Sequence, residues 1–298
     1  MTMIEKTTDT TPASPPVSWP LSDQKEQAQL EAWFSAKGID FNKPGIHDQR
    51  AFLKAEQVNP RVLEFVSRYV EARKYSDDEL LDASRKIRIA SEAVSAALER
   101  DGGLGKCIVA ASSLSRMLDE LGIWNYTAKA NVSVHFPSDI RQSSRHFYSM
   151  DITRFEAPHA IVVAPPFAII DPSIKFQAYD TPEMRASIPG LVISDEMRPY
   201  RPLYRNMISP ELRALRRLGD DERQLELFIK TNSLHMLDLM AQLPPRQTHF
   251  GKDGCLEYAI VAIGGYPEKL HDLVHPNTLL DGLSPLEIFK RDVQPFVA

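Results

Sequence analysis

The chain has 298 residues, of which 43% are hydrophobic and 25% are charged, and this composition is close to that of ordinary soluble globular proteins. At roughly 100–200 residues per domain, the length suits one large domain or two small ones. The net charge of −5 argues against general binding to nucleic acid or to an anionic membrane surface. Two cysteines are too few for a disulfide framework, and no apolar run approaches the ~18 residues of a membrane span.

The first segment, residues 1–20, is rich in Thr, Pro and Ser. Such a composition buries too little apolar surface to offset the entropy of ordering, so we expect a disordered tail. The segment lacks the apolar region of a secretory signal. Together with the low cysteine content, this favours a cytoplasmic protein in a reducing compartment. A non-cleaved export signal inside the tail is an open alternative.

Residues 21–100 carry apolar side chains at helical spacing, which predicts an N-terminal helical lobe. Ser76 followed by Glu79 has the pattern of a capping box and predicts a long helix that continues through Leu98. The glycine-rich residues 101–105 end that helix.

The next part of the chain changes from helical to strand periodicity. Residues 106–121 carry one apolar stripe and predict a buried helix, whereas residues 125–134 alternate between apolar and polar side chains, as in a half-buried strand. Two short apolar runs, His159–Ala164 and Phe167–Asp171, predict strands that are covered on both faces, and His146–Ile152 is a possible further strand. A helix followed by antiparallel strands indicates an α+β fold.

Helical signals return in residues 181–298, which we interpret as a mainly helical C-terminal lobe. Ser209 and Ser284 are each followed by proline, the pattern of an N-cap with proline in the first turn. A further helix is expected at about Asp221–Ala241.

Cys107 is the candidate nucleophile. It follows glycines and opens the predicted helix, so its thiol would lie beside unpaired N–H groups and the positive end of the helix dipole, which favour the thiolate. The same N–H groups could hold the oxyanion of a tetrahedral intermediate. A thiol nucleophile also needs a base and a group that orients the base.

His159 begins the first of the two apolar strands and Asp171 ends the second. If the connection between the strands has an odd number of residues, the two side chains face each other across the ladder, close enough for a hydrogen bond. An even connection would place them on opposite faces unless a bulge intervenes. A histidine held in this way would present its other nitrogen to the thiol.

These residues resemble a known family. Gly-Lys-Cys at a helix start, then His-Ala-Ile-Val-Val and Ile-Ile-Asp-Pro-Ser, are similar to the transglutaminase-like superfamily of papain-like cysteine enzymes. The resemblance covers about residues 100–178, and the core domain that it implies is residues 101–180. It implies a papain-like core, in which a nucleophile helix packs on a small antiparallel sheet, with added helices at both ends. It also implies a catalytic triad of Cys107, His159 and Asp171.

The activity implied is cysteine-dependent acyl transfer on an amide or thioester carbonyl, as in a thiol hydrolase or acyltransferase. Water would resolve the acyl-enzyme in a cysteine protease, amidase or deamidase, and an amine would do so in transamidation; we favour amide hydrolysis. The expected substrates are a peptide, a protein side-chain amide or a small acyl compound, with no cofactor, no metal, no nucleic acid and no membrane partner. Two alternatives are a catalytically silent scaffold of the same fold and a delivered effector that modifies a protein glutamine.

Three weaker signals are less favoured. Residues 102–106 resemble a phosphate loop but lack the glycine and the hydroxyl residue at the required positions. Cys255 with His271 and His275 could supply three zinc ligands, yet no fourth ligand has tight spacing. Cys255 with His271 and Asp281 could form a second nucleophile site, but no strand pair would align it.

Overall fold

The computed structural model describes residues 19–152 and 158–297. Most of the predicted tail, residues 1–18, lies outside the described residues. Trp19, which we had placed in that tail, is buried, and its indole N–H donates a hydrogen bond of 2.7 Å to the Glu71 carbonyl. The described chain therefore begins at a side chain that packs in the core.

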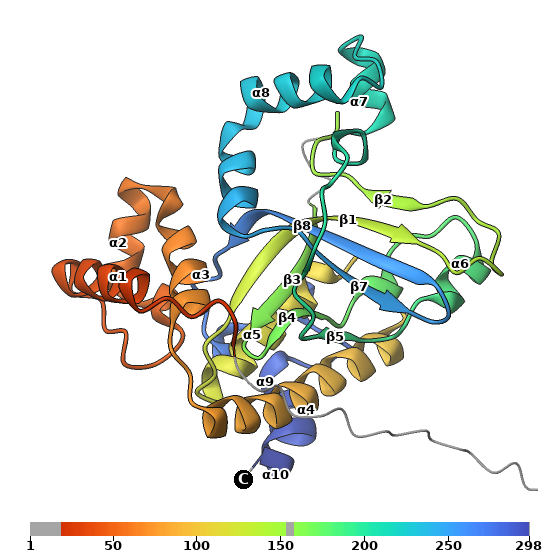
Figure 1. Cartoon of the computed structure of the whole chain (residues 1–298). Helices are drawn as coiled ribbons and strands as arrows, with labels where there is room; N and C mark the ends of the chain where they lie inside the picture. Colours follow the sequence, from red (N-terminus) through yellow and green to blue (C-terminus); the bar gives the residue numbers. More distant parts are fainter. Residues whose placement is uncertain (1–18, 153–157, 298) are drawn as a thin grey trace, which may run out of the picture.

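The centre of the α+β fold is one curled antiparallel sheet, a half-barrel in shape (Figure 1). Its strand order is β5-β4-β3-β1-β8-β7-β6, and β2 pairs with β1 outside this path. The strands are β1 (Tyr126–His135), β2 (Arg145–Phe147), β3 (His159–Ala164), β4 (Phe167–Asp171), β5 (Val192–Ser194), β6 (Arg198–Pro199), β7 (Arg246–Phe250) and β8 (Gly254–Gly264).

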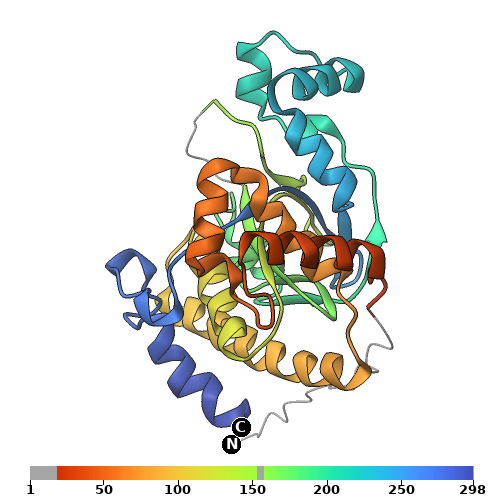
Figure 2. The same cartoon turned by 90° about the vertical axis from the view of Figure 1, so that its left-hand side faces the viewer.

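Helices pack on both faces of this sheet. They are α1 (Gln24–Lys37), α2 (Arg50–Val58), α3 (Leu63–Ala72), α4 (Asp77–Asp101), α5 (Cys107–Glu120), α6 (Pro182–Ser187), α7 (Pro210–Leu215), α8 (Glu222–Gln242), α9 (Pro285–Ile288) and α10 (Gln294–Val297). Helices α1–α3 lie together on one side, α4 and α5 lie on another with α9 and α10, and α7 with the first half of α8 extends away from the sheet (Figures 1 and 2).

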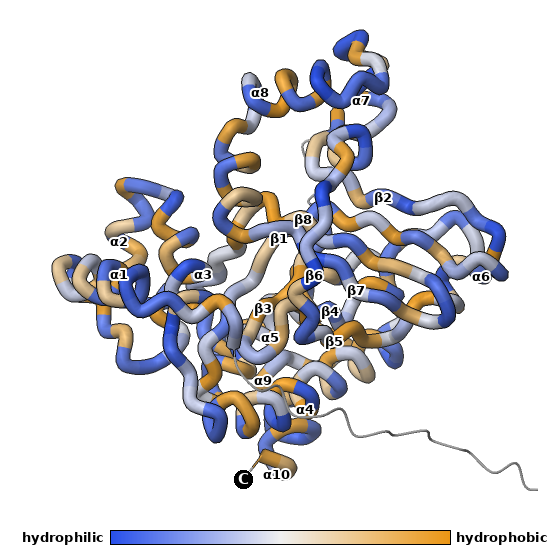
Figure 3. The backbone as a smooth tube through the Cα atoms, viewed as in Figure 1, coloured by the Kyte–Doolittle hydropathy of each residue, from blue (hydrophilic) through white to orange (hydrophobic). Residues whose placement is uncertain are grey.

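Alternation along β3 defines the two faces of the sheet. Ile161 and Val163 pack in a core with side chains of α1 and α3, and we call this side the α3 face. Ala160 and Val162 pack against α4 and α5 on the α5 face. The tube is largely orange around β3 and β4, whereas it alternates between blue and orange along the outlying helices (Figure 3). Because both faces are covered, β3 and β4 are buried along their whole length, as the sequence predicted.

The predicted elements of residues 101–180 are confirmed. Helix α5 occupies the predicted apolar stripe, β1 occupies the alternating segment, and β3 and β4 have the predicted bounds. The strand expected at His146–Ile152 is shorter, because β2 pairs with β1 only from Val132 to Val134 before β3 takes the same edge of β1. The long helix α4 begins after Ser76, whose hydroxyl accepts the Glu79 N–H at 3.2 Å.

The C-terminal part contains strands that we did not predict. We expected residues 181–298 to be mainly helical, but β8 from this segment pairs along the length of β1 and occupies the middle of the sheet. Its side chains enter different cores, with Tyr258 on the α3 face and Ala259 under α8. From Tyr258 to Val261 the strand is buried on both faces and shows no alternation, so this stretch resembles a buried helix. No helix in the described residues is both long and apolar enough to cross a bilayer.

Candidate functional site

Cys107 is the first residue of α5, and its side chain is 8% exposed. The thiol therefore lies at the end of the helix where N–H groups lack partners within the helix and the dipole is positive. The preceding turn is fixed in place. Gly105 has φ of 74°, and its N–H donates to the Phe176 carbonyl at 2.9 Å. The ammonium group of Lys106 is bound to Asp101 at 2.8 Å.

His159 and Asp171 form a buried hydrogen-bonded pair. His159 Nε2 lies 2.7 Å from Asp171 Oδ2, and both side chains are fully buried. The connection between their strands, residues 165–166, has an even number of residues, which alone would separate the two side chains. The register changes between two strand pairs, Val162↔Ile170 and Ala164↔Phe167, so β4 carries one extra residue.

This bulge returns Asp171 to the face on which His159 lies. This is the second of the two cases expected from the sequence, an even connection with a bulge; the condition for direct opposition, an odd connection, is not met. Continuing the register from Val162↔Ile170 places Asp171 opposite Ile161, two residues along β3 from His159. The two side chains are diagonal neighbours, a separation that long side chains can bridge.

Hydrogen bonds fix the orientation of the Asp171 carboxylate. Oδ1 accepts the Ser173 N–H at 2.9 Å and the Ser173 hydroxyl at 3.1 Å. Oδ2 accepts the Tyr258 hydroxyl at 3.1 Å in addition to the His159 ring. A carboxylate that binds Nε2 in this way keeps the proton of the neutral imidazole on Nε2 and leaves Nδ1 for another partner.

Cys107 is the group with which that second nitrogen can interact. Nδ1 of His159 is buried and has no hydrogen-bond partner among the described residues. Burial lowers the pKa of His159, but the charge of Asp171 and the hydrogen bond to it outweigh burial and raise the pKa to about 10. Burial raises the pKa of Cys107, whereas His159 and the N–H of Ala160 lower it, with a net pKa below the usual value. Both shifts favour a thiolate–imidazolium pair.

The second cysteine has different surroundings. Cys255 lies in β8, with its sulfur 3.8 Å from the Gln247 side-chain oxygen. Burial and the charge of Glu257 raise the pKa of Cys255 to about 11. The pKa of Cys107 is therefore lowered and that of Cys255 is raised. A lowered pKa favours the reactive thiolate, so Cys107 is the better candidate nucleophile.

The weaker predictions gain no support from the structure. No group of three His, Cys, Asp or Glu side chains among the described residues is arranged to hold a metal ion, and this includes Cys255 with His271 and His275. The carboxylate proposed to assist Cys255, Asp281, is instead bound to Arg100 at 2.7 Å.

A cleft with a volume of about 800 Å³ opens onto Cys107. Its lining includes Leu104, Ile108, Phe147 and Gln177, so the walls near the thiol are largely apolar. The Phe147 ring lies 6.0 Å from the His159 ring. This closeness follows from the sheet, because β2 ends with Phe147 opposite Val132 and β3 begins with His159 opposite Ala130.

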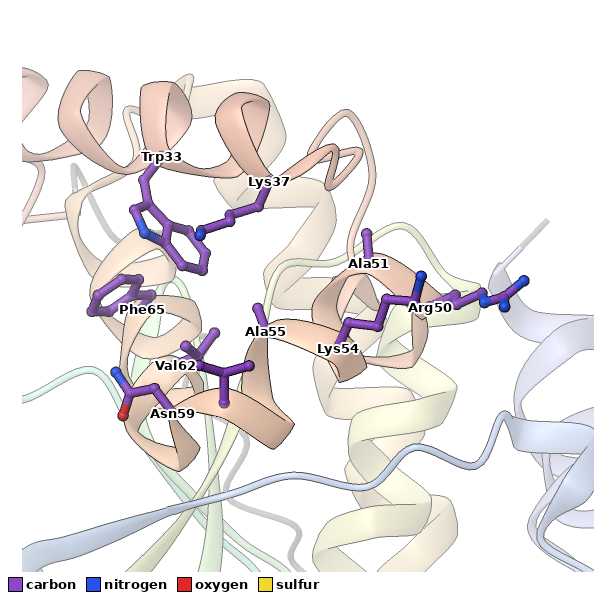
Figure 4. Close-up of a pocket in the computed structure, with 10 residues that line it drawn as sticks. Trp33, Lys37, Arg50, Ala51, Lys54, Ala55, Asn59, Val62 and Phe65 are labelled. Carbon is purple, nitrogen blue, oxygen red and sulfur yellow. The ribbon is translucent and has the colours of Figure 1, made fainter.

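A second hollow of about 770 Å³ lies among α1, α2 and α3 (Figure 4). Trp33 and Phe65 form its aromatic side, and Lys37, Arg50 and Lys54 lie around it. Its lining contains no cysteine, serine, histidine or carboxylate. The candidate nucleophile Cys107 therefore lines the other cleft and not this hollow.

Three residues of the site were not predicted from the sequence. Ser173 had a local signal, because Asp-Pro-Ser is typical of a turn in which a carboxylate binds the N–H two residues later. Tyr258 had none, since its strand resembles a buried helix. Phe147 reaches His159 only through the pairing of both strands with β1.

Comparison with known proteins yields no relative: no family model, no curated protein and no solved structure matches this chain. Its function must therefore be inferred from the chemistry of the site itself.

Proposed function

We propose that this protein is a cysteine-dependent acyl-transfer enzyme with a papain-like, transglutaminase-like core. The observation that carries the proposal is the buried His159–Asp171 pair, 2.7 Å between Nε2 and Oδ2, beside a thiol at a helix N-terminus that opens onto a cleft. A structural cysteine needs none of these partners. The order of nucleophile helix, histidine strand and aspartate strand supports the resemblance to this superfamily.

The reaction begins with the thiolate of Cys107, whose proton resides on Nδ1 of His159. Sulfur attacks the carbonyl carbon of an amide, a C–S bond forms, and the π electrons move to the carbonyl oxygen. Main-chain N–H groups in the first turn of α5 are available to bind this oxyanion. When the intermediate collapses, the C–N bond breaks and the amine leaves with the proton from His159.

The second half-reaction releases the acyl group. Water attacks the thioester carbonyl while His159 takes its proton, and the C–S bond then breaks to restore the thiolate. An amine in place of water would give transamidation by the same steps. Asp171 keeps Nε2–H of the ring bonded in each step, so that Nδ1 always faces the reacting atoms. We favour hydrolysis because water is the default acceptor.

The proposal is tested by trapping the acyl-enzyme. The full chain is incubated with a mixture of synthetic peptides containing glutamine, products are read by mass spectrometry, and hydroxylamine is added to capture a thioester as a hydroxamate. We expect a hydroxamate with the native protein and with Cys255→Ala, and none with Cys107→Ala or His159→Ala. Equal product with native protein and Cys107→Ala would overturn the proposal.

A further inference from the structure

The cleft at Cys107 is also lined by a positively charged side chain that takes no part in the proposed triad. Arg145 begins β2 and lines the cleft together with Cys107. Its register partner on β1 is Val134, so Arg145 and Phe147 share the face on which Val132 and Val134 are buried. This is the α3 face, on which His159 also lies.

The position of Arg145 relative to the triad follows from two ring contacts. Its guanidinium carbon lies 5.7 Å from the centre of the Phe147 ring, and that ring lies 6.0 Å from the ring of His159. The register of β2 and β3 on β1 therefore places Arg145, Phe147 and His159 in a row along one edge of β1, and the guanidinium and the imidazole both contact the Phe147 ring.

Arg145 has no anionic partner in the described structure. It takes part in no ion pair there, and its Nε atom is buried without a hydrogen-bond partner. A buried guanidinium N–H that lacks an acceptor is costly, and Arg is suited to binding a carboxylate through two parallel hydrogen bonds. Glu257, which lies on β8 opposite Ser133, is within 3.1 Å of His135 Nε2.

The cleft is also lined by two carboxylates, Asp151 and Glu211, and both lie at its α7 side. Glu211 is in the first turn of α7, and Asp151 accepts the Ser209 hydroxyl at 2.6 Å, just before the same helix. Tyr148 also lines the cleft. Tyr179, whose ring is 6.0 Å from Phe147, interacts with the charges of Arg145 and Asp171. Arg145 is thus joined to the triad through Phe147, whereas Glu211 lies in α7 and Asp151 is bound to the residue before it.

We propose that Arg145 binds a carboxylate of the substrate, so that the enzyme acts on amides with a free carboxylate one or two residues from the reacting carbonyl, such as the C-terminal end of a peptide. This inference rests on the proposed function, and it names the substrate class of the same site. Arg145 is a specificity residue in this account, since the guanidinium would contact the bound substrate without touching the atoms that react.

The test uses alkylating probes that differ in charge alone. Chloroacetyl-glycine and chloroacetyl-glycylglycine are each used as the free acid and as the amide, and each added glycine extends the reach of the carboxylate by about 3.5 Å. The thiolate displaces chloride from carbon and leaves a C–S bond. The rate at Cys107 is measured by mass spectrometry, with N-acetylcysteine amide as the reference thiol.

We expect the acid-to-amide rate ratio of at least one probe length to exceed that of the reference thiol by about tenfold. Arg145→Gln should abolish this excess, and the acid-to-amide ratio cancels any change in the reactivity of the thiol itself; Arg145→Lys should retain part of the excess. Lys54→Gln, in the hollow of α1–α3, is the matched control for loss of one positive charge and should retain all of it. The same ratio in Arg145→Gln and native protein would overturn the inference.

A second measurement does not depend on the reactivity of the thiol. Acetyl-glycylglycine and its amide are titrated into ¹⁵N-labelled protein, and the Arg145 Nε–H signal is followed by NMR. A shift of this signal with the acid and not with the amide supports the carboxylate site, even if Cys107 proves inert and the proposed function fails. Absence of a shift with either compound, together with equal alkylation ratios, overturns the inference while leaving the triad in place.

Discussion

His159 and Asp171 are diagonal neighbours on one face of the β3–β4 ladder, and a bulge of one residue in β4 places them there. Without the extra residue, the two-residue connection between the strands would send Asp171 to the α5 face. The site thus depends on a local irregularity of the sheet. Its consequence is electrostatic, because the carboxylate reaches the imidazole in a fully buried setting where charges are weakly screened.

The first prediction concerns the protonation of His159. With Asp171 in place the pKa of His159 is raised to about 10, and in Asp171→Asn burial should lower this pKa below its ordinary value of 6.5. NMR titration of ¹³C-labelled histidine in both proteins measures this difference. A His159 signal that titrates at the same pH in both would contradict the ion pair.

The same substitution should change stability in a direction set by the sign of that shift. Because the pKa of His159 is raised on folding, its contribution to the free energy of unfolding is fully present below pH 6.5 and is lost as the pH rises through about 10. At pH 6, Asp171→Asn should cost about 3–5 kcal/mol, as when one partner of a buried pair is removed. Urea denaturation of native protein and variant at pH 6 and pH 10 measures both effects, and the deficit should shrink at the higher pH.

Tyr258 is expected to act on Asp171 and not on the thiol. Tyr258→Phe removes one hydrogen bond to a carboxylate, which should lower the free energy of unfolding by about 1.5–3 kcal/mol. The pH dependence of Cys107 alkylation should persist, since the Asp171–His159 contact remains. Urea denaturation with half-buried Tyr204→Phe as control tests this, and unchanged stability in Tyr258→Phe would show that the hydroxyl contributes nothing.

The sequence predicted the parts of the site that depend on local pattern. Cys107 at a helix start, and His159 and Asp171 at the ends of two apolar runs, can all be identified from periodicity and turn residues. The bulge could not be predicted, because it depends on how β3 and β4 pack between the two cores. Tyr258 was missed for a related reason: β8 is buried on both faces from Tyr258 to Val261, and a continuous apolar run does not distinguish strand from helix. Nothing in the sequence pattern pointed to Arg145, because only the pairing of the strands brings it beside Phe147.

His47 should make the protein sensitive to acid. It is buried, and burial together with the charge of Arg116 lowers its pKa to about 3. In the unfolded chain it takes up a proton below pH 6.5, so the free energy of unfolding should fall by about 1.4 kcal/mol per pH unit between pH 6.5 and 3 from this group alone. Urea denaturation at pH 7 and pH 5 should show a shallower pH dependence in His47→Gln than in native protein or exposed His275→Gln. An identical slope in all three would contradict this prediction.

A buried ion pair links α3 to the sheet. The guanidinium of Arg246 contacts the carboxylate of Glu71, which also accepts the Tyr126 hydroxyl at 2.6 Å. Arg246 donates a second hydrogen bond of 3.1 Å to the Ala168 carbonyl. Glu71→Gln would leave the arginine buried without its counter-charge and should cost about 3–5 kcal/mol.

The double variant Glu71→Met with Arg246→Met distinguishes the loss of a partner from the loss of packing. Since no charge stays buried in the double variant, it should lose less stability than the sum of the two single variants. Urea denaturation of the four proteins measures this difference. Additive losses would mean that the two side chains do not stabilise each other.

The central claim, that Cys107 exists as a thiolate paired with His159, is tested most directly by iodoacetamide alkylation across pH 5–9, read by mass spectrometry at both cysteines. We predict that Cys107 reacts rapidly below pH 7 while Cys255, whose pKa is raised to about 11, does not, and that His159→Ala abolishes the low-pH reaction. If Cys107 is inert, or reacts in native protein and in His159→Ala with the pH dependence of a free thiol near 8.5, the triad and the function built on it are wrong.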